Sequence, residues 1–402
     1  MSETEPKNSL RVLFLTPSVR LLGARQSLLS TVKNLPDHIV PVVVCSGEGE
    51  LTEELRESQV ETEVVDQHPW RKLRGRVGAT LFQIPQLKKI VSRFQPDVIH
   101  CNEYHITPQG VRSAASAEAC CAVTTHVRSA LPEKHFCNYE LHKTQGIAVV
   151  SRSFEPQFEA AGLGHLTAVI YNGVDLSRYE SANGVQNREL RREAGWCETD
   201  LVVGQLALIS PNKQQLVLAE AVARANARGA RVRLLLAGDA FNSTHSYAQV
   251  LQERIAREDL RSSVCWLPFQ KDVKPIYDCM DLNALISLEE GFGRTIIEAG
   301  QQGIASIGSN RGGIPEIIRP NETGFLVQPD CVDEIADCLV AAYQEREKIR
   351  QMGKEAKVHI EQNFTLKTSL EKLEAFWKQA HHKATLKKLM KFTAIMISAA
   401  NL

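Results

Sequence analysis

The 402-residue sequence predicts an α/β protein made of two doubly wound domains, each built on an open parallel sheet. Short apolar runs recur along the chain, and they are continuous rather than alternating, which is typical of strands buried on both faces of a parallel sheet. Helical patterns separate these runs, so that strand, helix and strand alternate with right-handed crossovers. A chain of this length also exceeds what one compact core usually holds.

The first domain is expected to span residues 1–178. Its predicted strands are Leu10–Leu15, Ile39–Cys45, Val98–Cys101, Ala122–Thr125, Ile147–Val150 and Ala168–Tyr171. Helical patterns lie between several of them, for example at Gln26–Leu35 and Gln86–Phe94. A polar segment, Ser177–Asn187, follows the last of these strands and is predicted to be a linker or interdomain loop.

The second domain is expected to span residues 179–374. Its predicted strands are Leu201–Leu208, Val232–Ala237, Val264–Leu267, Leu282–Ser287, Ile304–Ile307 and Gly324–Val327. Its predicted helices are Gln215–Arg228, Ala248–Arg257, Arg294–Gln301 and Asp333–Gln351. Ligands of such sheets bind beyond the carboxyl ends of the strands, so two domains of this kind are expected to face each other across a cleft that holds the site.

The C-terminal part of the chain is helical in pattern. Residues 375–402 are expected to form a helix that packs back on the first domain. Their last stretch, Leu386–Leu402, places lysines beside large apolar side chains. An amphipathic helix on a membrane surface, giving weak peripheral membrane contact, is therefore the alternative.

Composition excludes some classes of partner. Lys plus Arg and Asp plus Glu are both 47, so no net charge favours nucleic acid as a partner. A local basic cluster beside Trp70 could contact an anionic acceptor or a lipid headgroup, or could be a solvated loop; it consists of Arg71, Lys72, Arg74 and Arg76.

Ten cysteines without a Cys-x-x-Cys pair are expected to be reduced thiols. A polar N-terminus and the lack of a long apolar run predict a cytoplasmic protein, with peripheral contact at the inner membrane face as a variant.

One glycine-rich segment after a buried strand carries the chemistry. Gly291 and Gly293 allow the backbone to approach a ligand closely. The helix expected from Arg294 onward begins with free amides and the positive end of its dipole, which suit a phosphate. Glu290 in the loop and Glu298 in the helix could accept hydrogen bonds from different hydroxyls of one ligand.

This segment, Glu289 to Gly300, resembles the E-x7-E motif of retaining GT-B glycosyltransferases, in particular those of family 4. The resemblance implies that Glu290 holds the donor sugar and that Glu298 binds the ribose. It also implies that the backbone after Glu290 meets the sugar and the diphosphate. The donor-binding residues expected here are Gly291, Phe292, Gly293, Arg294, Thr295 and Glu298.

Further stretches of the second half resemble the same family in the same order. Ser210–Gln214 resembles its lysine-bearing loop, which implies that Lys213 pairs with the diphosphate. Leu234–Asp239 resembles a strand that ends near the nucleotide, with Gly238 and Asp239 at its end. The remaining stretches are Asp281–Ser287, Arg311–Glu316 and Asn321–Val327.

The first half resembles the family more loosely. Gly23 lies between the first strand and the first helix, where its backbone could approach a donor or acceptor, although a tight turn explains it as well. His126 ends a central strand, and the resemblance implies a histidine near the donor sugar there; a structural histidine is the alternative. The Asn172–Gly173 turn is expected to be structural.

Two positions depart from the family pattern. Leu208 stands where the family usually has an arginine that contacts the diphosphate, and Gln214 stands where it has a glycine. The hypothesis that follows is that Arg294 or Arg311 supplies the missing positive charge, since both are expected in loops that border the same pocket.

Together these features predict transfer of a hexosyl-type sugar from a nucleotide diphosphate sugar to an unidentified glycan, lipid or small-molecule acceptor, in the synthesis of surface polysaccharide or glycoconjugate. The resemblance implies retention at the anomeric carbon with no metal or other cofactor, and the sequence has no Asp-x-Asp motif. The expected catalytic residues are Glu290, His126 and Lys213. The alternatives are a nucleotide-sugar-binding protein without catalysis, and a nucleotide-sugar epimerase or phosphorylase-like transferase on the same fold. A dinucleotide-dependent dehydrogenase is disfavoured, because no Gly-x-Gly-x-x-Gly follows the first strand.

Overall fold

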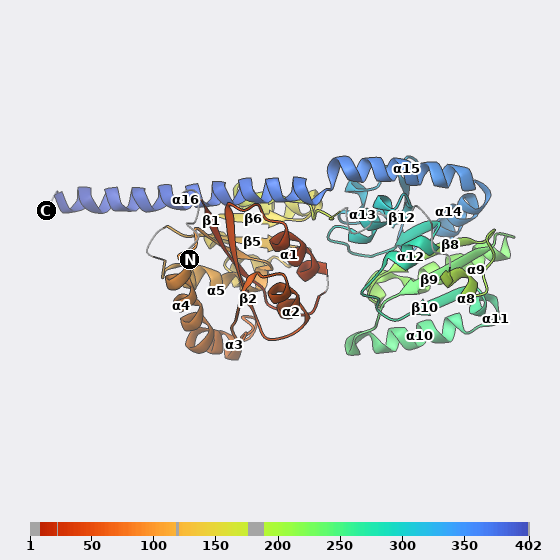
Figure 1. The fold of residues 1–402 in the computed structure, drawn as a ribbon, viewed down its shortest axis with the longest axis horizontal. Coiled ribbons are helices and arrows are strands. Elements are labelled where there is room, and N and C mark those ends of the chain that lie inside the picture. Colours follow the sequence, from red (N-terminus) through yellow and green to blue (C-terminus); the bar gives the residue numbers. More distant parts are fainter. Residues whose placement is uncertain (1–8, 22, 118–119, 176–188, 401–402) are drawn as a thin grey trace. The chain divides into compact units, whose positions relative to one another are not determined.

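The computed structural model describes residues 9–21, 23–117, 120–175 and 189–400. The chain divides into two compact units (Figure 1). Unit 1 consists of residues 1–173 and 366–402, and unit 2 consists of residues 174–365. The boundary expected at residues 178 and 179 and the expected linker Ser177–Asn187 lie outside the described residues.

Among the described residues of unit 1, seven parallel strands form one sheet in the order β3-β2-β1-β4-β5-β6-β7. They are β1 (Leu10–Leu15), β2 (Ile39–Cys45), β3 (Glu61–Val64), β4 (Val98–Cys101), β5 (Ala122–Val127), β6 (Gly146–Val149) and β7 (Thr167–Val169). The strands expected from apolar runs are confirmed to within two residues at each end. β3 was not expected, because it lies at the sheet edge and alternates glutamates with Thr62 and Val64 instead of forming an apolar run.

Helices cover both faces of this sheet, because successive residues of a strand point to opposite sides. Val12 and Phe14 of β1 share one core with residues of three helices, α1 (Gly23–Lys33), α2 (Glu50–Glu57) and α16 (Leu366–Ala400). Leu13 and Leu15 share another core with residues of α4 (Ile84–Phe94). The helices are α1 (Gly23–Lys33), α2 (Glu50–Glu57), α3 (Leu73–Gly78), the π-helical segment η1 (Ala79–Gln83), α4 (Ile84–Phe94), α5 (Thr107–Ala114), α6 (Lys134–Asn138), α7 (Glu155–Ala160) and α16 (Leu366–Ala400).

The long C-terminal helix α16 completes the core of unit 1. Its Trp377 is fully buried, and its ring meets the rings of Phe14 and His100 edge-on, with 5.5 Å between centroids in each case. The indole nitrogen donates a hydrogen bond to Nδ1 of His100 over 3.2 Å, and Thr124 lies 2.9 Å from the same nitrogen. Burial, with a smaller effect of Arg128, lowers the pKa of His100 to about 3, so the ring stays neutral.

In the part of unit 2 that the structure describes, six parallel strands form a sheet in the order β10-β9-β8-β11-β12-β13. They are β8 (Leu201–Leu206), β9 (Val232–Ala237), β10 (Val264–Leu267), β11 (Leu282–Leu285), β12 (Ala305–Ser309) and β13 (Gly324–Val327). The helices are α8 (Glu189–Glu193), α9 (Gln215–Ala227), α10 (His245–Ile255), α11 (Glu258–Arg261), α12 (Lys274–Cys279), α13 (Arg294–Gln301), α14 (Val332–Gln344) and α15 (Arg346–Asn363). The single helix expected at Asp333–Gln351 is wrong, because Glu345 leaves the helical region (ψ 51°) and separates α14 from α15.

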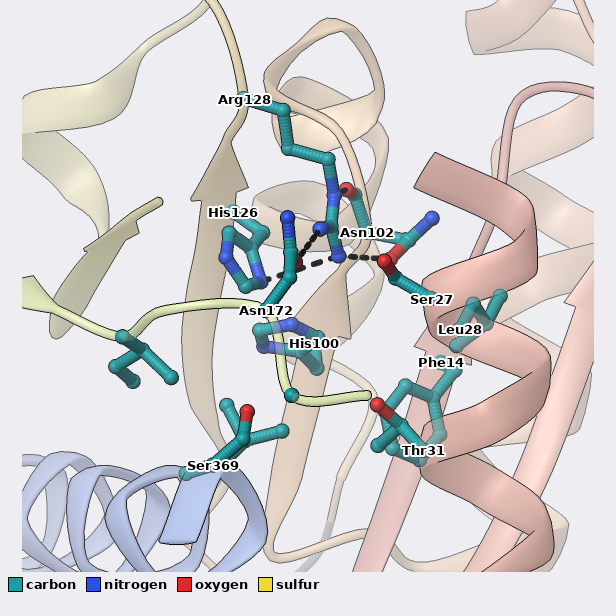
Figure 2. A pocket seen from close by; sticks show the side chains of 13 residues that line it. Phe14, Ser27, Leu28, Thr31, His100, Asn102, His126, Arg128, Asn172 and Ser369 are labelled. Carbon is teal, nitrogen blue, oxygen red and sulfur yellow. Dashed lines mark hydrogen bonds between the residues drawn. The ribbon is translucent and has the colours of Figure 1, made fainter. Parts of the chain in front are cut away.

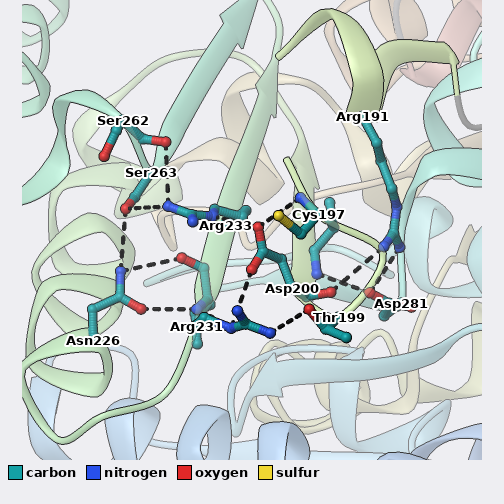
Figure 3. Close-up of polar contacts among 12 residues, drawn as sticks. Arg191, Cys197, Thr199, Asp200, Asn226, Arg231, Arg233, Ser262, Ser263 and Asp281 are labelled. Carbon is teal, nitrogen blue, oxygen red and sulfur yellow. Dashed lines mark hydrogen bonds and ion pairs between the residues drawn. The ribbon is translucent and has the colours of Figure 1, made fainter. Parts of the chain in front are cut away.

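A network of ion pairs holds the amino ends of the unit 2 strands (Figure 3). The buried Arg191 donates to the Asp281 carboxylate over 2.7 Å, just before β11. The fully buried Asp200, just before β8, accepts from Arg233 of β9 over 2.9 Å. Buried charges are tolerated only when they are paired, so these contacts link neighbouring strands at the end of the sheet opposite to the loops described below.

Replacing the buried indole tests the role of α16. We expect Trp377→Ala to lower the free energy of unfolding by about 3–5 kcal/mol, because it opens a cavity beside Phe14 and removes one hydrogen-bond donor to His100. Chemical denaturation followed by circular dichroism measures this loss. Leu389→Ala, at a side chain of the same helix that is 58% exposed, should change the free energy by less than about 0.5 kcal/mol. Equal effects of the two variants would contradict the packing role.

The buried histidines make stability depend on pH. Burial also holds the pKa of His126 well below its usual 6.5, so His100 and His126 remain unprotonated in the folded chain at pH values where the unfolded chain binds protons. Stability is therefore present above pH 6.5 and is lost as the pH falls below it, by about 1.4 kcal/mol per pH unit for each ring. Urea denaturation between pH 7.5 and 5 should show a shallower slope for His126→Asn than for wild type. His142→Asn, at an exposed position, is the control. Parallel slopes for all three proteins would refute this explanation.

Candidate active site

Two loops at the carboxyl ends of neighbouring strands are bound to each other in unit 2. One follows β8 and contains Asn212, and the other follows β11 and contains Leu288 and Glu289. The Asn212 side chain donates to the carbonyl of Glu289 and accepts from its amide, both over 2.9 Å. The amide of Leu288 donates to the carbonyl of Asn212, also over 2.9 Å. These contacts fix the two loops side by side, although 77 positions separate Asn212 from Glu289.

This arrangement brings Lys213 and Glu290 together as an ion pair. The lysine ammonium contacts the Glu290 carboxylate and lies 3.4 Å from the hydroxyl of Ser287. The two side chains are only 20% and 16% exposed, so each charge depends on the other for compensation. Gln205 donates to the backbone carbonyl of Lys213 over 2.7 Å and holds the lysine loop from the strand below.

The backbone at Glu290 is fixed by the turn expected at Arg311–Glu316. Gly312 has a φ of +54°, and a Cβ atom at this position would lie 1.8 Å from the carbonyl oxygen of Glu290. Glycine is therefore required, for its conformation and for this close approach. Gly313 donates to the same carbonyl over 3.2 Å, while the neighbouring Arg311 side chain is exposed.

Helix α13 begins directly after this loop. Gly293 precedes it with a φ of +107° and, being a glycine, has no side chain of its own to cap the first turn. The hydroxyl of Thr295 is buried and has no partner among the described groups. Phe292 is buried against Phe364, so only its backbone remains near the start of the helix. Amides in a first helical turn attract anions. The helix expected from Arg294 onward is confirmed, and its role in binding phosphate stays a prediction.

Glu298 lies one turn further along α13 and is engaged within the protein. It is 7% exposed, and its two oxygens accept from the Tyr277 hydroxyl over 3.0 Å and from Arg294 over 3.1 Å. The structure thus brings Arg294 and Glu298 together. The sequence does not predict Tyr277 as a partner of Glu298. Tyr277 lies on α12, among apolar residues whose pattern indicates only a place in the core.

The glycine–aspartate pair after β9 lies in the same unit. Gly238 approaches the backbone so closely that a Cβ atom would lie 2.0 Å from the carbonyl of Ala207. One oxygen of the Asp239 carboxylate accepts from the amide of Phe269 over 3.0 Å. The close approach to Ala207 therefore explains why a glycine stands at position 238, and Asp239 holds the loop after β10.

The remaining predicted residues, Gly23 and His126, belong to unit 1. Gly23 begins α1, and a Cβ atom there would meet no described heavy atom within 4 Å. A side chain would therefore find space at this turn, and packing does not require a glycine. Its expected role near a ligand stays a prediction.

His126 belongs to a polar cluster at the carboxyl ends of the unit 1 strands (Figure 2). Arg128 donates to the side-chain oxygen of Asn172 over 2.7 Å and to that of Asn102 over 2.9 Å. The guanidinium nitrogen that donates to Asn102 also lies 3.3 Å from Nδ1 of His126. These residues border a small cavity that also reaches Ser369 of α16 and has room for one or two water molecules.

The contact with Arg128 fixes the protonation of His126. A guanidinium can only donate, so Nδ1 of His126 accepts and Nε2 carries the hydrogen. That Nε2 atom is buried and has no partner among the described groups. Burial, then Arg128 and then His100, lower the pKa of the ring well below 6.5. His126 is thus a neutral hydrogen-bond donor in this state.

Sequence reasoning did not single out Asn102, Arg128 or Asn172 as site residues. The signal that could have found them is their position, since each lies one to three residues beyond the carboxyl end of a parallel strand, where ligands of such sheets bind.

Two sequence families match the chain. The family described as Glycosyl transferases group 1 matches residues 186–359, and Glycosyltransferase Family 4 matches residues 23–178. The putative glycosyltransferase EpsD of Bacillus subtilis is 26% identical over 68% of this chain and 74% of its own length. D-inositol 3-phosphate glycosyltransferase of Nocardia farcinica is 30% identical over 48% of this chain, and the match spans only 43% of that relative.

Solved structures agree with this relationship. The Anabaena protein HepE, in complex with UDP-glucose, has a TM-score of 0.78 and 25% identity, with 91% of this chain and 98% of that chain covered. A glycosyltransferase from Rickettsia africae has a TM-score of 0.80 at 18% identity, with 93% and 99% covered. With family matches in both units and two parallel-sheet Rossmann-like domains, the chain belongs to the group 1 glycosyltransferases of the GT-B fold.

Proposed function

We propose that the chain transfers a hexosyl-type sugar from a nucleotide diphosphate sugar to a glycan, lipid or small-molecule acceptor, with retention at the anomeric carbon. The observation that carries the proposal is the pairing of Lys213 with Glu290 beside the glycine-rich start of α13. A cation, the amides of a helix start and a carboxylate are groups that suit a diphosphate and a sugar. The family resemblance supports retention, and synthesis of surface polysaccharide or glycoconjugate is the setting that we propose.

The leaving diphosphate would be stabilised by charges that are already in place. The Lys213 ammonium has three hydrogens, so it can keep its contact with Glu290 while another hydrogen meets a phosphate oxygen. The first amides of α13 and the unpartnered hydroxyl of Thr295 would serve the same anion. Because the ion pair already orders the lysine, little side-chain entropy is lost when the donor binds.

Glu290 and His126 would orient sugars rather than transfer protons. The Glu290 carboxylate accepts hydrogen bonds from sugar hydroxyls, and its fixed backbone sets its direction. His126 presents a neutral Nε2–H group, so it would donate a hydrogen bond to the donor sugar and would not act as an acid. The HepE complexes contain UDP, glucose and UDP-glucose, which makes UDP-hexoses the first donors to try.

We also propose that transfer needs no metal ion, since the sequence lacks an Asp-x-Asp motif and Lys213 with the α13 amides can carry the positive potential. Chelation with EDTA should leave the rate of donor turnover unchanged. A rate that EDTA abolishes and that added Mg²⁺ restores would refute this part of the proposal.

Donor hydrolysis and thermal shift against UDP-, GDP- and ADP-sugars test the main proposal. Lys213→Met should lower turnover of the active donor by about 100- to 1000-fold, because it removes a charge from the leaving group. Glu290→Gln should lower turnover as well, since a neutral amide holds sugar hydroxyls less strongly. Glu289→Gln, at an exposed neighbour in the same loop, should have wild-type turnover.

Two outcomes separate chemistry from folding. If Lys213→Met is unstable because Glu290 is left without its partner, the double variant with Glu290→Gln should regain stability but not activity. A thermal shift with a nucleotide sugar but no turnover with any acceptor would favour the alternative of a nucleotide-sugar-binding protein, for which Leu208 is the supporting observation. Unchanged turnover in Glu290→Gln would overturn the assigned role.

A separate experiment addresses the missing arginine at Leu208. We propose that Arg294 or Arg311 takes its place, with Arg294 tested first because it opens the phosphate-binding helix. Arg294→Gln should weaken donor binding by about 10- to 100-fold, the usual effect of losing a charged hydrogen bond. Titration calorimetry measures this, and Leu208→Arg should restore affinity in that background. If Arg294→Gln binds normally and Arg311→Gln does not, then Arg311 is the substitute.

A further inference from the structure

One stretch of unit 1 is strongly basic. Between Asp66 and Asp97 the sequence has no acidic residue but contains seven cationic ones, namely Arg71, Lys72, Arg74, Arg76, Lys88, Lys89 and Arg93. The structure shows that this stretch is largely helical, consisting of α3, the π-helical segment η1 and α4 in direct succession. The basic cluster noted in the sequence therefore lies at and just before the start of a helix and not in an open loop.

The same helix exposes large apolar side chains. Leu73 is 78% exposed, Val77 49%, Leu81 61% and Phe82 60%. Leu73, Val77 and Leu81 follow at intervals of four residues, which places them along one side of a helix. Single exposed apolar residues are ordinary, but four within ten positions form a patch of the kind that marks an interaction site.

This surface is held rigidly. A Cβ atom on Gly75 would lie 1.8 Å from the carbonyl of Pro69, so the helix start packs closely on the preceding turn. Trp70 is buried beneath the guanidinium of Arg112, which lies 4.3 Å from its ring centroid. The buried Gln83 accepts from the amide of His68 over 3.2 Å at the π-helical segment. The exposure of the apolar side chains is thus built into the fold.

Most of the cations in this basic stretch have no carboxylate partner among the described residues. Arg76 donates to the carbonyl of Trp70, and Arg93 pairs with Glu63. The others are exposed and form no ion pair with any carboxylate in the described parts of the chain; they are Arg71, Lys72, Arg74, Lys88 and Lys89. Their charge therefore remains uncompensated by neighbouring acids and complements an anionic surface.

We propose that this basic-apolar face, formed by residues 71–74, 77, 81 and 82, docks on the surface of a lipid bilayer that contains anionic lipids. The apolar side chains would enter the boundary between headgroups and acyl chains, while the cations meet lipid phosphates. A soluble polyanion would use the cations but would not bury Leu73, Leu81 and Phe82. Among the described residues no helix is long and apolar enough to cross a membrane. The proposal does not rest on the proposed transferase chemistry.

Flotation of the full chain with vesicles tests the proposal. The chain should bind vesicles of phosphatidylcholine mixed with phosphatidylglycerol, and should bind phosphatidylcholine alone much more weakly. Arg71→Gln with Lys72→Gln and Arg74→Gln should lower partitioning by about a hundredfold, since each cation near an anionic leaflet contributes roughly a fivefold factor. Leu73→Ser with Leu81→Ser and Phe82→Ser should lower it by at least about tenfold, because their burial is lost.

A matched triple variant on another exposed surface is the control. Lys387→Gln with Leu389→Ser and Met390→Ser changes one cation and two exposed apolar side chains on α16, and it should bind vesicles as wild type does. Loss of binding in this variant would assign the contact to α16 and overturn the proposal. Normal binding by the apolar variant, with loss in the cationic one, would show charge attraction to any polyanion without burial of the apolar side chains and would overturn the proposal too. Failure of the wild-type chain to bind anionic vesicles would do the same.

Discussion

The ion pair between Lys213 and Glu290 is the constraint around which the rest of unit 2 is arranged. It can form only because β8 and β11 are parallel neighbours in the sheet, so that the loops leaving them emerge together. Buried pairing at the amino ends of the strands and the asparagine bridge at their carboxyl ends keep that register. The Gly312 turn then fixes the carboxylate, and α13 starts where the loop ends.

Much of the fold could be predicted because buried parallel strands consist of continuous apolar residues, as in β1, β2 and β9. The edge strand β3 lacked that signal, since none of its residues is fully buried and three of the four are polar. The division between α14 and α15 was also hidden, because one residue with non-helical dihedrals interrupts a helix without interrupting its apolar period.

The candidate residues of unit 2 and those of unit 1 differed in how well the sequence could predict them. In unit 2, the glycine-rich loop and the helix after it are contiguous, so one segment contains Glu290, Arg294 and Glu298, and the motif predicts them together. In unit 1, the contacts of Arg128 reach Asn102 and Asn172, which lie 26 and 44 positions away. Only the order of the strands in the sheet brings these three residues together, and no local sequence pattern predicts that order.

Unit 2 is inserted within the sequence of unit 1, and α16 returns to finish the first core. Val174 pairs with Thr365, so the chain enters and leaves unit 2 at one place. During synthesis the ribosome therefore delivers a complete unit 2 while the first sheet still lacks the helix that covers Phe14 and His100. The nascent chain must carry that uncovered apolar face until α16 has emerged, which makes the covering of Phe14 and His100 a late step of folding and a natural point for chaperone assistance.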